Sequence, residues 1–148
     1  MIALLQRVSA SSVTVEDERI ASIGRGVNIL LGILKGDEEK DALKLVEKIV
    51  KSRIFADETG RMNLSLTDIG GSALVVSQFT LAGDVKKGRR PSFDAAMPPE
   101  EAKRLYRLFC EELGRHVPVQ TGRFGAMMDV EIHNNGPVTF ILNSKALP

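Results

Sequence analysis

The segment 27–34 constrains the fold of this chain more than any other part of its sequence. It reads Val-Asn-Ile-Leu-Leu-Gly-Ile-Leu, which is apolar at nearly every position. A strand with one face in water alternates between apolar and polar residues, whereas a nearly continuous apolar run is typical of a strand buried on both faces. We therefore expect segment 27–34 to lie inside a sheet that is covered on both sides.

Other patterned segments predict further strands. Residues 2–8, 12–16 and 19–23 are expected to form an opening hairpin unit, because the polar residues 16–18 supply a turn. Residues 73–81 are rich in β-branched and aromatic side chains and indicate another strand. The tail from Val117 onward predicts two or more strands, in which Asn-Asn-Gly-Pro at 134–137 interrupts 127–132 and 138–142.

Two helices are expected between these strands. Asp37 is the predicted N-cap of the first, which has apolar residues at helical spacing and ends near Arg53. The second opens at Pro98-Pro99 and stops at Gly114. This order predicts the α/β (α+β) class: one domain over residues 1–148, with an antiparallel or mixed sheet, curled or closed into a barrel, and the two helices packed outside.

Charge and cysteine content exclude several classes of protein. The chain has 148 residues and a formal net charge of +1, so any contact with RNA must come from a local basic patch. Cys110 is the single cysteine, which rules out an internal disulfide and a multi-thiolate zinc site. The apolar start is too short for a signal peptide and no later run is long enough to cross a membrane, so we expect a cytoplasmic protein.

Cofactor and metal signatures are missing from the sequence. It contains neither a dinucleotide-binding glycine pattern nor a phosphate-loop motif. His116 and His133 are far apart in the sequence and neither has a second histidine at helical ligand spacing, and Cys110 has no visible activating partner. No cofactor and no metal are expected.

Three short motifs nevertheless carry groups that could bind or react with a substrate. Each of them also has a simpler structural interpretation. Ser-Gln-Phe-Thr-Leu at 77–81 presents two hydroxyls and an amide, although polar residues on a strand often only face solvent. Residues 134–139 read as a hairpin turn or as a place for a cis Gly-Pro bond. Lys86, Lys87, Arg89 and Arg90 form a cluster that is either solvated surface or a phosphate-binding patch.

Together these motifs make the chain resemble the D-aminoacyl-tRNA deacylase family. The similarity rests on Gln-Arg-Val at 6–8, on Ser-Gln-Phe-Thr-Leu at 77–81, on Gly-Arg-Arg-Pro-Ser-Phe at 88–93 and on Asn-x-Gly-Pro-Val-Thr at 134–139. It covers essentially the whole chain. The resemblance implies a homodimeric hydrolase that releases D-amino acids from tRNA as chiral proofreading, and glycine from mischarged glycyl-tRNA(Ala).

The resemblance also implies roles for particular residues. Gly136 and Pro137 would enter the partner subunit's pocket as a Gly-cis-Pro element, where their carbonyls would exclude an L side chain. The catalytic residues would be Ser77, Gln78, Phe79 and Thr80. Backbone N–H groups around Gln78, Phe79 and Thr80 would stabilise the oxyanion, and Thr80 would position the substrate while water attacks with help from the substrate's 2′-hydroxyl. Arg7 would orient the Gly136–Pro137 carbonyls, and Phe93 and Met128 would line the adenosine pocket.

Lys86, Lys87, Arg89 and Arg90 are the predicted tRNA contacts. A second hypothesis, of a different class, is a non-catalytic RNA-binding or assembly module that uses this same cluster. Binding of tRNA without turnover, lost when the cluster is neutralised, would favour the second hypothesis.

Overall fold

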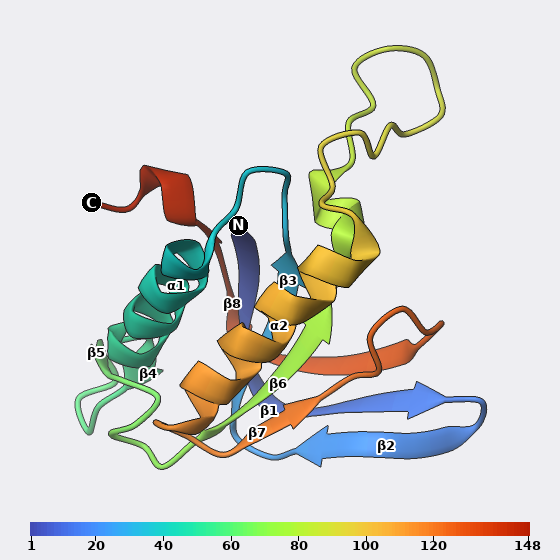
Figure 1. Cartoon of the computed structure of the whole chain (residues 1–148). Coiled ribbons are helices and arrows are strands. Elements are labelled where there is room, and N and C mark those ends of the chain that lie inside the picture. The colour runs from blue at the N-terminus through green and yellow to red at the C-terminus, as the bar shows by residue number, and fades with distance from the viewer.

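The computed structural model describes all residues 1–148, and its centre is the strand β3 (Gly26–Gly32). β3 pairs in parallel with β6 (Ser72–Ser77), which pairs in parallel with β7 (Val119–Thr121). On its other side β3 pairs in antiparallel register with the first half of β1 (Ile2–Val15). The sheet is therefore mixed, as the sequence predicts (Figure 1).

The long strand β1 connects this sheet to its remaining strands. Its second half pairs with β2 (Glu18–Ile23), and β8 (Asp129–Asn143) pairs along the whole of its other edge. β2 curls back toward β7, where the Ser22 N–H donates to Gln120 Oε1 at 2.8 Å. The six strands therefore form a nearly closed barrel.

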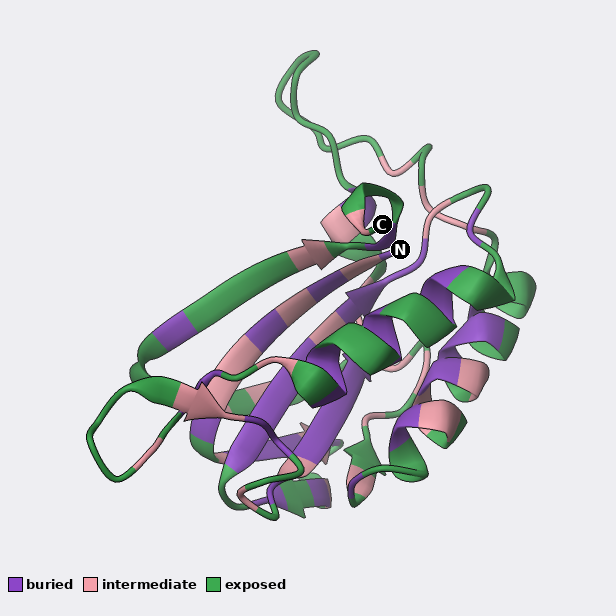
Figure 2. Ribbon diagram, turned by 90° about the vertical axis from the view of Figure 1, so that its left-hand side faces the viewer, coloured by how far each residue is buried: buried purple, intermediate pink, exposed green.

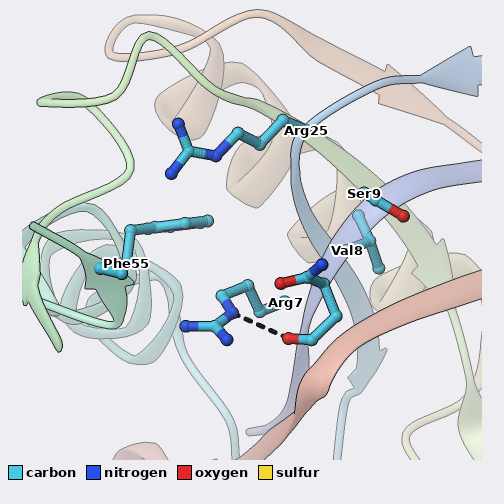
Figure 3. Close-up of a pocket in the computed structure, with 7 residues that line it drawn as sticks. Arg7, Val8, Ser9, Arg25 and Phe55 are labelled. Carbon is cyan, nitrogen blue, oxygen red and sulfur yellow. Dashed lines mark hydrogen bonds between the residues drawn. The ribbon is translucent and has the colours of Figure 1, made fainter. Parts of the chain in front are cut away.

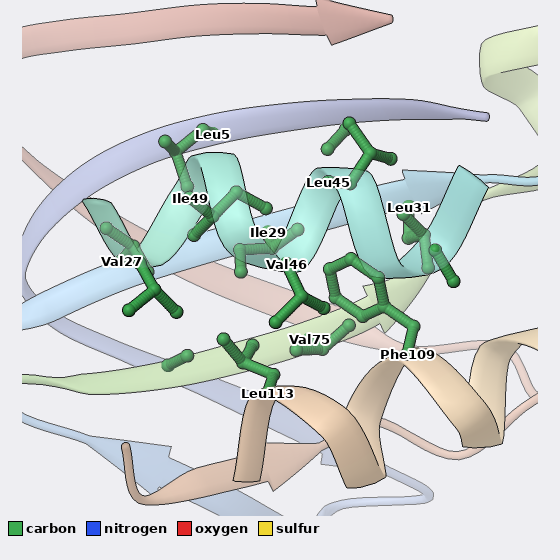
Figure 4. Packing of buried hydrophobic residues seen from close by; sticks show 14 of the residues in the cluster. Leu5, Val27, Ile29, Leu31, Leu45, Val46, Ile49, Val75, Phe109 and Leu113 are labelled. Atoms are coloured by element: carbon green, nitrogen blue, oxygen red, sulfur yellow. The ribbon is translucent and has the colours of Figure 1, made fainter. Parts of the chain in front are cut away.

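Two helices cover the outside of the sheet. α1 (Glu39–Lys51) and α2 (Pro99–Gly114) lie next to each other over the face formed by β3 and β6, with their buried stripes turned inward (Figure 2). Leu45, Ile49, Phe109 and Leu113 are among the largest side chains that they bury against the sheet (Figure 4). Neither helix has the length and apolar character needed to cross a membrane.

A second apolar cluster fills the inside of the barrel. Leu74 and Val76 of β6 point into it, whereas Ala73 and Val75 of the same strand face the helices. β3 is likewise covered on both sides, and its Asn28 is fully buried and donates to Ser11 Oγ at 2.9 Å. The prediction that segment 27–34 is covered on both faces of the sheet is confirmed for its part in β3.

The short elements lie at the ends of this framework. β4 (Phe55–Ala56) and β5 (Met62–Leu64) form a small hairpin after α1. The 3₁₀ turns η1 (Phe79–Ala82) and η2 (Ser144–Ala146) follow β6 and β8.

Two local predictions were wrong. The segments 2–8 and 12–16 are one bent strand, β1, with register shifts between Gln6 and Ala10. Asp37 is not the N-cap of α1: it accepts from the Leu34 N–H at 2.7 Å and from the Met1 amino group at 2.7 Å. Glu38 caps the helix instead, and its N–H donates to Asp41 at 2.8 Å.

Candidate active site

The predicted strand 73–81 ends early, at Ser77, and this early end creates the candidate site. The Gln78 N–H still donates to Leu31 O at 2.8 Å, but the chain then leaves the sheet and winds into η1. The turn can sit this close to β3 because residue 32 is glycine: a Cβ there would lie 2.8 Å from Leu81 Cβ. Phe79 and Thr80 are thereby lifted into solvent.

The first N–H groups of η1 are free to bind a substrate. Those of Phe79 and Thr80 donate to no protein acceptor, as is usual where a helical turn begins. The Gln78 N–H is already used by Leu31, so it is not available as an oxyanion donor. Two adjacent exposed donors therefore remain from the three that the sequence suggested.

The side chains at this turn are polar but contain no base. Gln78 Nε2 donates to Thr80 Oγ1, and no histidine or carboxylate is hydrogen-bonded to that hydroxyl. Ser77 is half-buried at the end of β6. The arrangement can position a substrate and stabilise negative charge, but it supplies no activated side-chain nucleophile.

Phe93 and Met128 lie in different places relative to this turn. The Phe93 ring packs edge-on against Phe79 with centroids 5.1 Å apart, so it borders η1 directly. Met128 packs on the barrel cluster, where its sulfur would lie 2.8 Å from a Cβ built on Gly122. Val76 also adjoins that position, which places Met128 beside the end of β6.

The Gly136–Pro137 segment is a bulge and not the turn of a hairpin. Residues on both sides of it pair with the same strand, since Asn134 lies opposite Val8 and Thr139 lies opposite Gln6. The peptide bond between Gly136 and Pro137 is cis, and both residues are exposed. The hairpin interpretation was therefore wrong.

Asn134 closes this bulge, a role that the residue-by-residue reading missed. Its Oδ1 accepts from the Val138 N–H at 2.7 Å, and its Nδ2 donates to Val138 O at 3.2 Å and to Thr139 Oγ1 at 2.9 Å. The motif Asn-x-Gly-Pro-Val-Thr contains all three residues, so their spacing was the available signal.

Arg7 anchors the bulge from β1, but through a different carbonyl from the one expected. Its Nε donates to Asn135 O at 2.9 Å (Figure 3), and its Nη1 donates to Ile54 O at 2.8 Å. A Cβ on Gly136 would lie 3.2 Å from the same guanidinium. Arg7 thus holds the residue before Gly136, and no hydrogen bond to the Gly136 or Pro137 carbonyl is formed.

One subunit does not bring the bulge and the η1 turn together. Arg7 lies opposite Val27 on β3, whereas Ser77 lies opposite Leu31, four residues further along the same strand. At about 3.3 Å per residue, the two positions are about 13 Å apart along the sheet. Within one chain the two motifs therefore lie apart.

The four predicted tRNA contacts lie at the tip of an extended loop (Figures 1 and 2). Lys86, Lys87, Arg89 and Arg90 are all exposed, and none forms an ion pair. Two main-chain hydrogen bonds between Asp84 and Ser92, of 2.8 and 2.7 Å, close the base of the loop. The loop therefore presents its charge beyond the η1 turn.

The remaining reactive side chains are not arranged for chemistry. Burial raises the pKa of the Cys110 thiol to about 12, so this residue is a packed thiol at neutral pH. His116 lies 3.9 Å from Glu112 and His133 lies 3.8 Å from Glu131, both on the surface. No three histidine, cysteine or acidic residues are grouped as metal ligands.

The chain is similar to known proteins over nearly its whole length. Residues 4–143 match the family described as D-Tyr-tRNA(Tyr) deacylase. A D-aminoacyl-tRNA deacylase from Persephonella marina is 60% identical over 147 residues, which cover 99% of this chain and all of the relative.

Two solved structures share the fold. One, named c-Myc DNA Unwinding Element Binding Protein, is 44% identical with a TM-score of 0.91, and the match covers 97% of this chain and 98% of the other. A probable eukaryotic D-amino acid tRNA deacylase superposes with a TM-score of 0.84 at 19% identity over 96% and 98% of the two chains, which supports the fold alone. The family match and the identity over the full length lead to one conclusion: this chain belongs to the D-Tyr-tRNA(Tyr) deacylase family.

Proposed function

We propose that this protein hydrolyses the ester bond of D-aminoacyl-tRNA and releases free tRNA and the D-amino acid. The observation that carries the proposal is the pair of free N–H groups on Phe79 and Thr80, within a motif of a chain that belongs to this family. Such donors suit the oxyanion of an ester hydrolysis, and removing one of them typically costs about 10²–10³ in rate.

The reaction uses main-chain N–H groups of the protein and the ribose 2′-hydroxyl of the substrate. Water adds to the ester carbonyl, and the resulting oxyanion accepts from the Phe79 and Thr80 N–H groups. The ribose 2′-hydroxyl relays the proton from the water to the 3′-oxygen as the ester bond breaks. Thr80 positions the substrate through the hydroxyl that Gln78 holds.

Selectivity comes from a second subunit in this proposal. The exposed Gly136–Pro137 bulge of one subunit lies against the η1 turn of the other, and its carbonyls repel an L side chain. The separation of about 13 Å along the sheet within one chain and the anchoring of Asn135 by Arg7 support this arrangement. Glycine has no side chain to repel, so glycyl-tRNA(Ala) is a further substrate.

Binding of the tRNA completes the proposal. Phe93, packed on Phe79, and Met128, at the end of β6, border the terminal adenosine. Lys86, Lys87, Arg89 and Arg90 contact the phosphate backbone, and the homodimer works in the cytoplasm.

The test compares the hydrolysis of D-Tyr-tRNA and L-Tyr-tRNA in the presence of EDTA. We expect rapid release of D-tyrosine and intact L-Tyr-tRNA, with no effect of the chelator. Equal hydrolysis of both substrates, or of neither, would contradict the proposal.

A non-catalytic nucleic-acid-binding module is the second candidate. It is favoured by the exposed cluster at 86–90 and by the solved relative that is named for binding a DNA element. Binding of nucleic acid without turnover of either charged tRNA, abolished by neutralising the cluster, would favour this candidate over the hydrolase.

A further inference from the structure

A groove on the outside of α2 carries three cations that the proposed chemistry does not use. Lys103 and Arg107 of α2 and Arg123 of the segment that joins β7 to β8 line it. Figure 1 shows the course of these two parts of the chain. All three side chains are exposed and form no ion pair; the ion pairs of α2 involve Arg104 and, just after the helix, Arg115. Glu111 is the single acidic residue of the lining.

The floor of the groove is aromatic and firmly held. Phe124 packs against Tyr106 with ring centroids 5.7 Å apart. The Tyr106 hydroxyl donates to Val75 O at 2.8 Å, which ties the floor to β6. Tyr106 is buried, so the half-buried Phe124 is the ring of this pair that a ligand can reach. Unpaired cations beside an accessible aromatic ring are a combination with which proteins bind single-stranded nucleic acid.

The groove leads to the end of β6, where the candidate active site begins. The Gly122 N–H donates to Val75 O at 3.0 Å, and Val75 precedes Ser77 by two residues. Met128, at the far end of the same connecting segment, adjoins Gly122. A chain of nucleotides that leaves the η1 turn along this edge of the sheet would pass over Arg123 and then along α2.

We propose that this groove binds the phosphate backbone of the single-stranded 3′ end of an RNA substrate. Lys103 and Arg107 are one helical turn apart, about 6 Å, so they can engage neighbouring phosphates while Arg123 contacts a third. The identification of the RNA as tRNA rests on the proposed function. The cluster at 86–90 is a separate contact on the other side of the turn.

The test measures the affinity for uncharged tRNA as a function of salt, which needs no turnover. The double variant Lys103→Gln/Arg107→Gln is compared with Lys44→Gln/Lys48→Gln, which removes two exposed cations at the same spacing from α1. Each phosphate contact contributes about 0.7 to the slope of log affinity against log salt for single strands. The slope of log affinity against log salt should therefore be smaller in magnitude by about 1.4 in the groove variant. This variant should also bind about tenfold more weakly at 0.15 M salt.

The control variant should keep the wild-type slope, and adding Arg123→Gln to the groove variant should bring the loss of slope to about 2. An unchanged slope in the groove variant, or equal losses in both double variants, would overturn the assignment.

A second readout uses D-tyrosyl-adenosine, which has no phosphates. The kcat/KM of the groove variant should fall about tenfold on D-Tyr-tRNA and stay unchanged on D-tyrosyl-adenosine. An equal loss on both substrates would also overturn the assignment of the groove to the RNA backbone. If the wild-type protein hydrolysed neither substrate, only the proposed function would fail, because the binding slopes are measured without hydrolysis.

Discussion

A proline at position 79 removes the main-chain N–H of Phe79. Phe79 is the first residue of η1, a position where proline is common, and Gln78 before it (φ −138°, ψ 80°) lies outside the α region that proline disfavours in the preceding residue. Phe79→Pro should therefore lose about 10²–10³ in kcat on D-Tyr-tRNA relative to Phe79→Ala, which lacks the same ring but keeps the N–H. Equal rates for the two variants, measured under single-turnover conditions, would show that this N–H is not an oxyanion donor.

The ionisation of Asp41 makes the free energy of unfolding depend on pH in the acid range. Burial alone would raise its pKa, but hydrogen bonds from the Glu38 N–H at 2.8 Å and from Lys145 Nζ at 2.9 Å outweigh burial and hold the pKa at about 2. Because the folded-state pKa is below the ordinary 3.8, the stabilisation is complete above about pH 4 and is lost as the pH falls toward 2.

Asp41→Asn should consequently lower the free energy of unfolding by about 2 kcal/mol at pH 7, with the difference from wild type shrinking below pH 4. Asp17→Asn, at an exposed turn, is the control and should be near neutral. Urea denaturation across this pH range measures both. A difference that stays constant from pH 7 to pH 2 would contradict the role of Asp41.

At the scale of elements, the contact between η1 and β3 at Gly32 sets the position of the donors. Gly32→Ala would place a Cβ 2.8 Å from Leu81 Cβ and 3.2 Å from Gln78 O, so the turn must move. Overpacking of this kind costs about 1–3 kcal/mol, and a displacement of about 1 Å at an active site can cost about 10²-fold in rate.

Gly24→Ala is the matched control, because a Cβ at Gly24 has nothing within 4 Å. Urea denaturation and the rate on D-Tyr-tRNA should separate the two variants. If Gly32→Ala retained wild-type stability and rate, η1 would not depend on close approach to β3.

The sequence predicted elements well where periodicity decides them. Apolar runs and helical stripes placed β3 and both helices to within a few residues, since burial of those faces determines their structure. The end of β6 and the bulge in β8 were missed, because both depend on neighbours distant in the sequence: Gly32 for the turn, and β1 for the pairing on both sides of Asn134. The motifs indicated candidate residues, but not that Gln78 uses its N–H within the sheet.

At the scale of the whole molecule, the fold exposes the bulge and the turn at separate ends of β3. A C2 dimer in which the bulge of each subunit lies against the η1 turn of the other has two equivalent sites. In the proposed dimer, the bulge of the partner subunit thus completes the site at η1.

Mixed dimers test this claim most directly. In one subunit Phe79→Pro removes one of the two proposed oxyanion donors and leaves the bulge intact. In the other, Gly136→Val distorts the bulge, because a Cβ there would lie 2.7 Å from Val138 Cγ2, but leaves the donors intact. The two subunits are co-expressed with different tags, and the mixed dimer is purified through both tags.

The decisive measurement is the rate of the purified mixed dimer on D-Tyr-tRNA and on L-Tyr-tRNA. We predict D-selective hydrolysis at about half the wild-type rate, since one of two sites has both intact parts, while each variant homodimer lacks selective activity. A mixed dimer that behaves like the Gly136→Val homodimer would contradict a site shared between subunits.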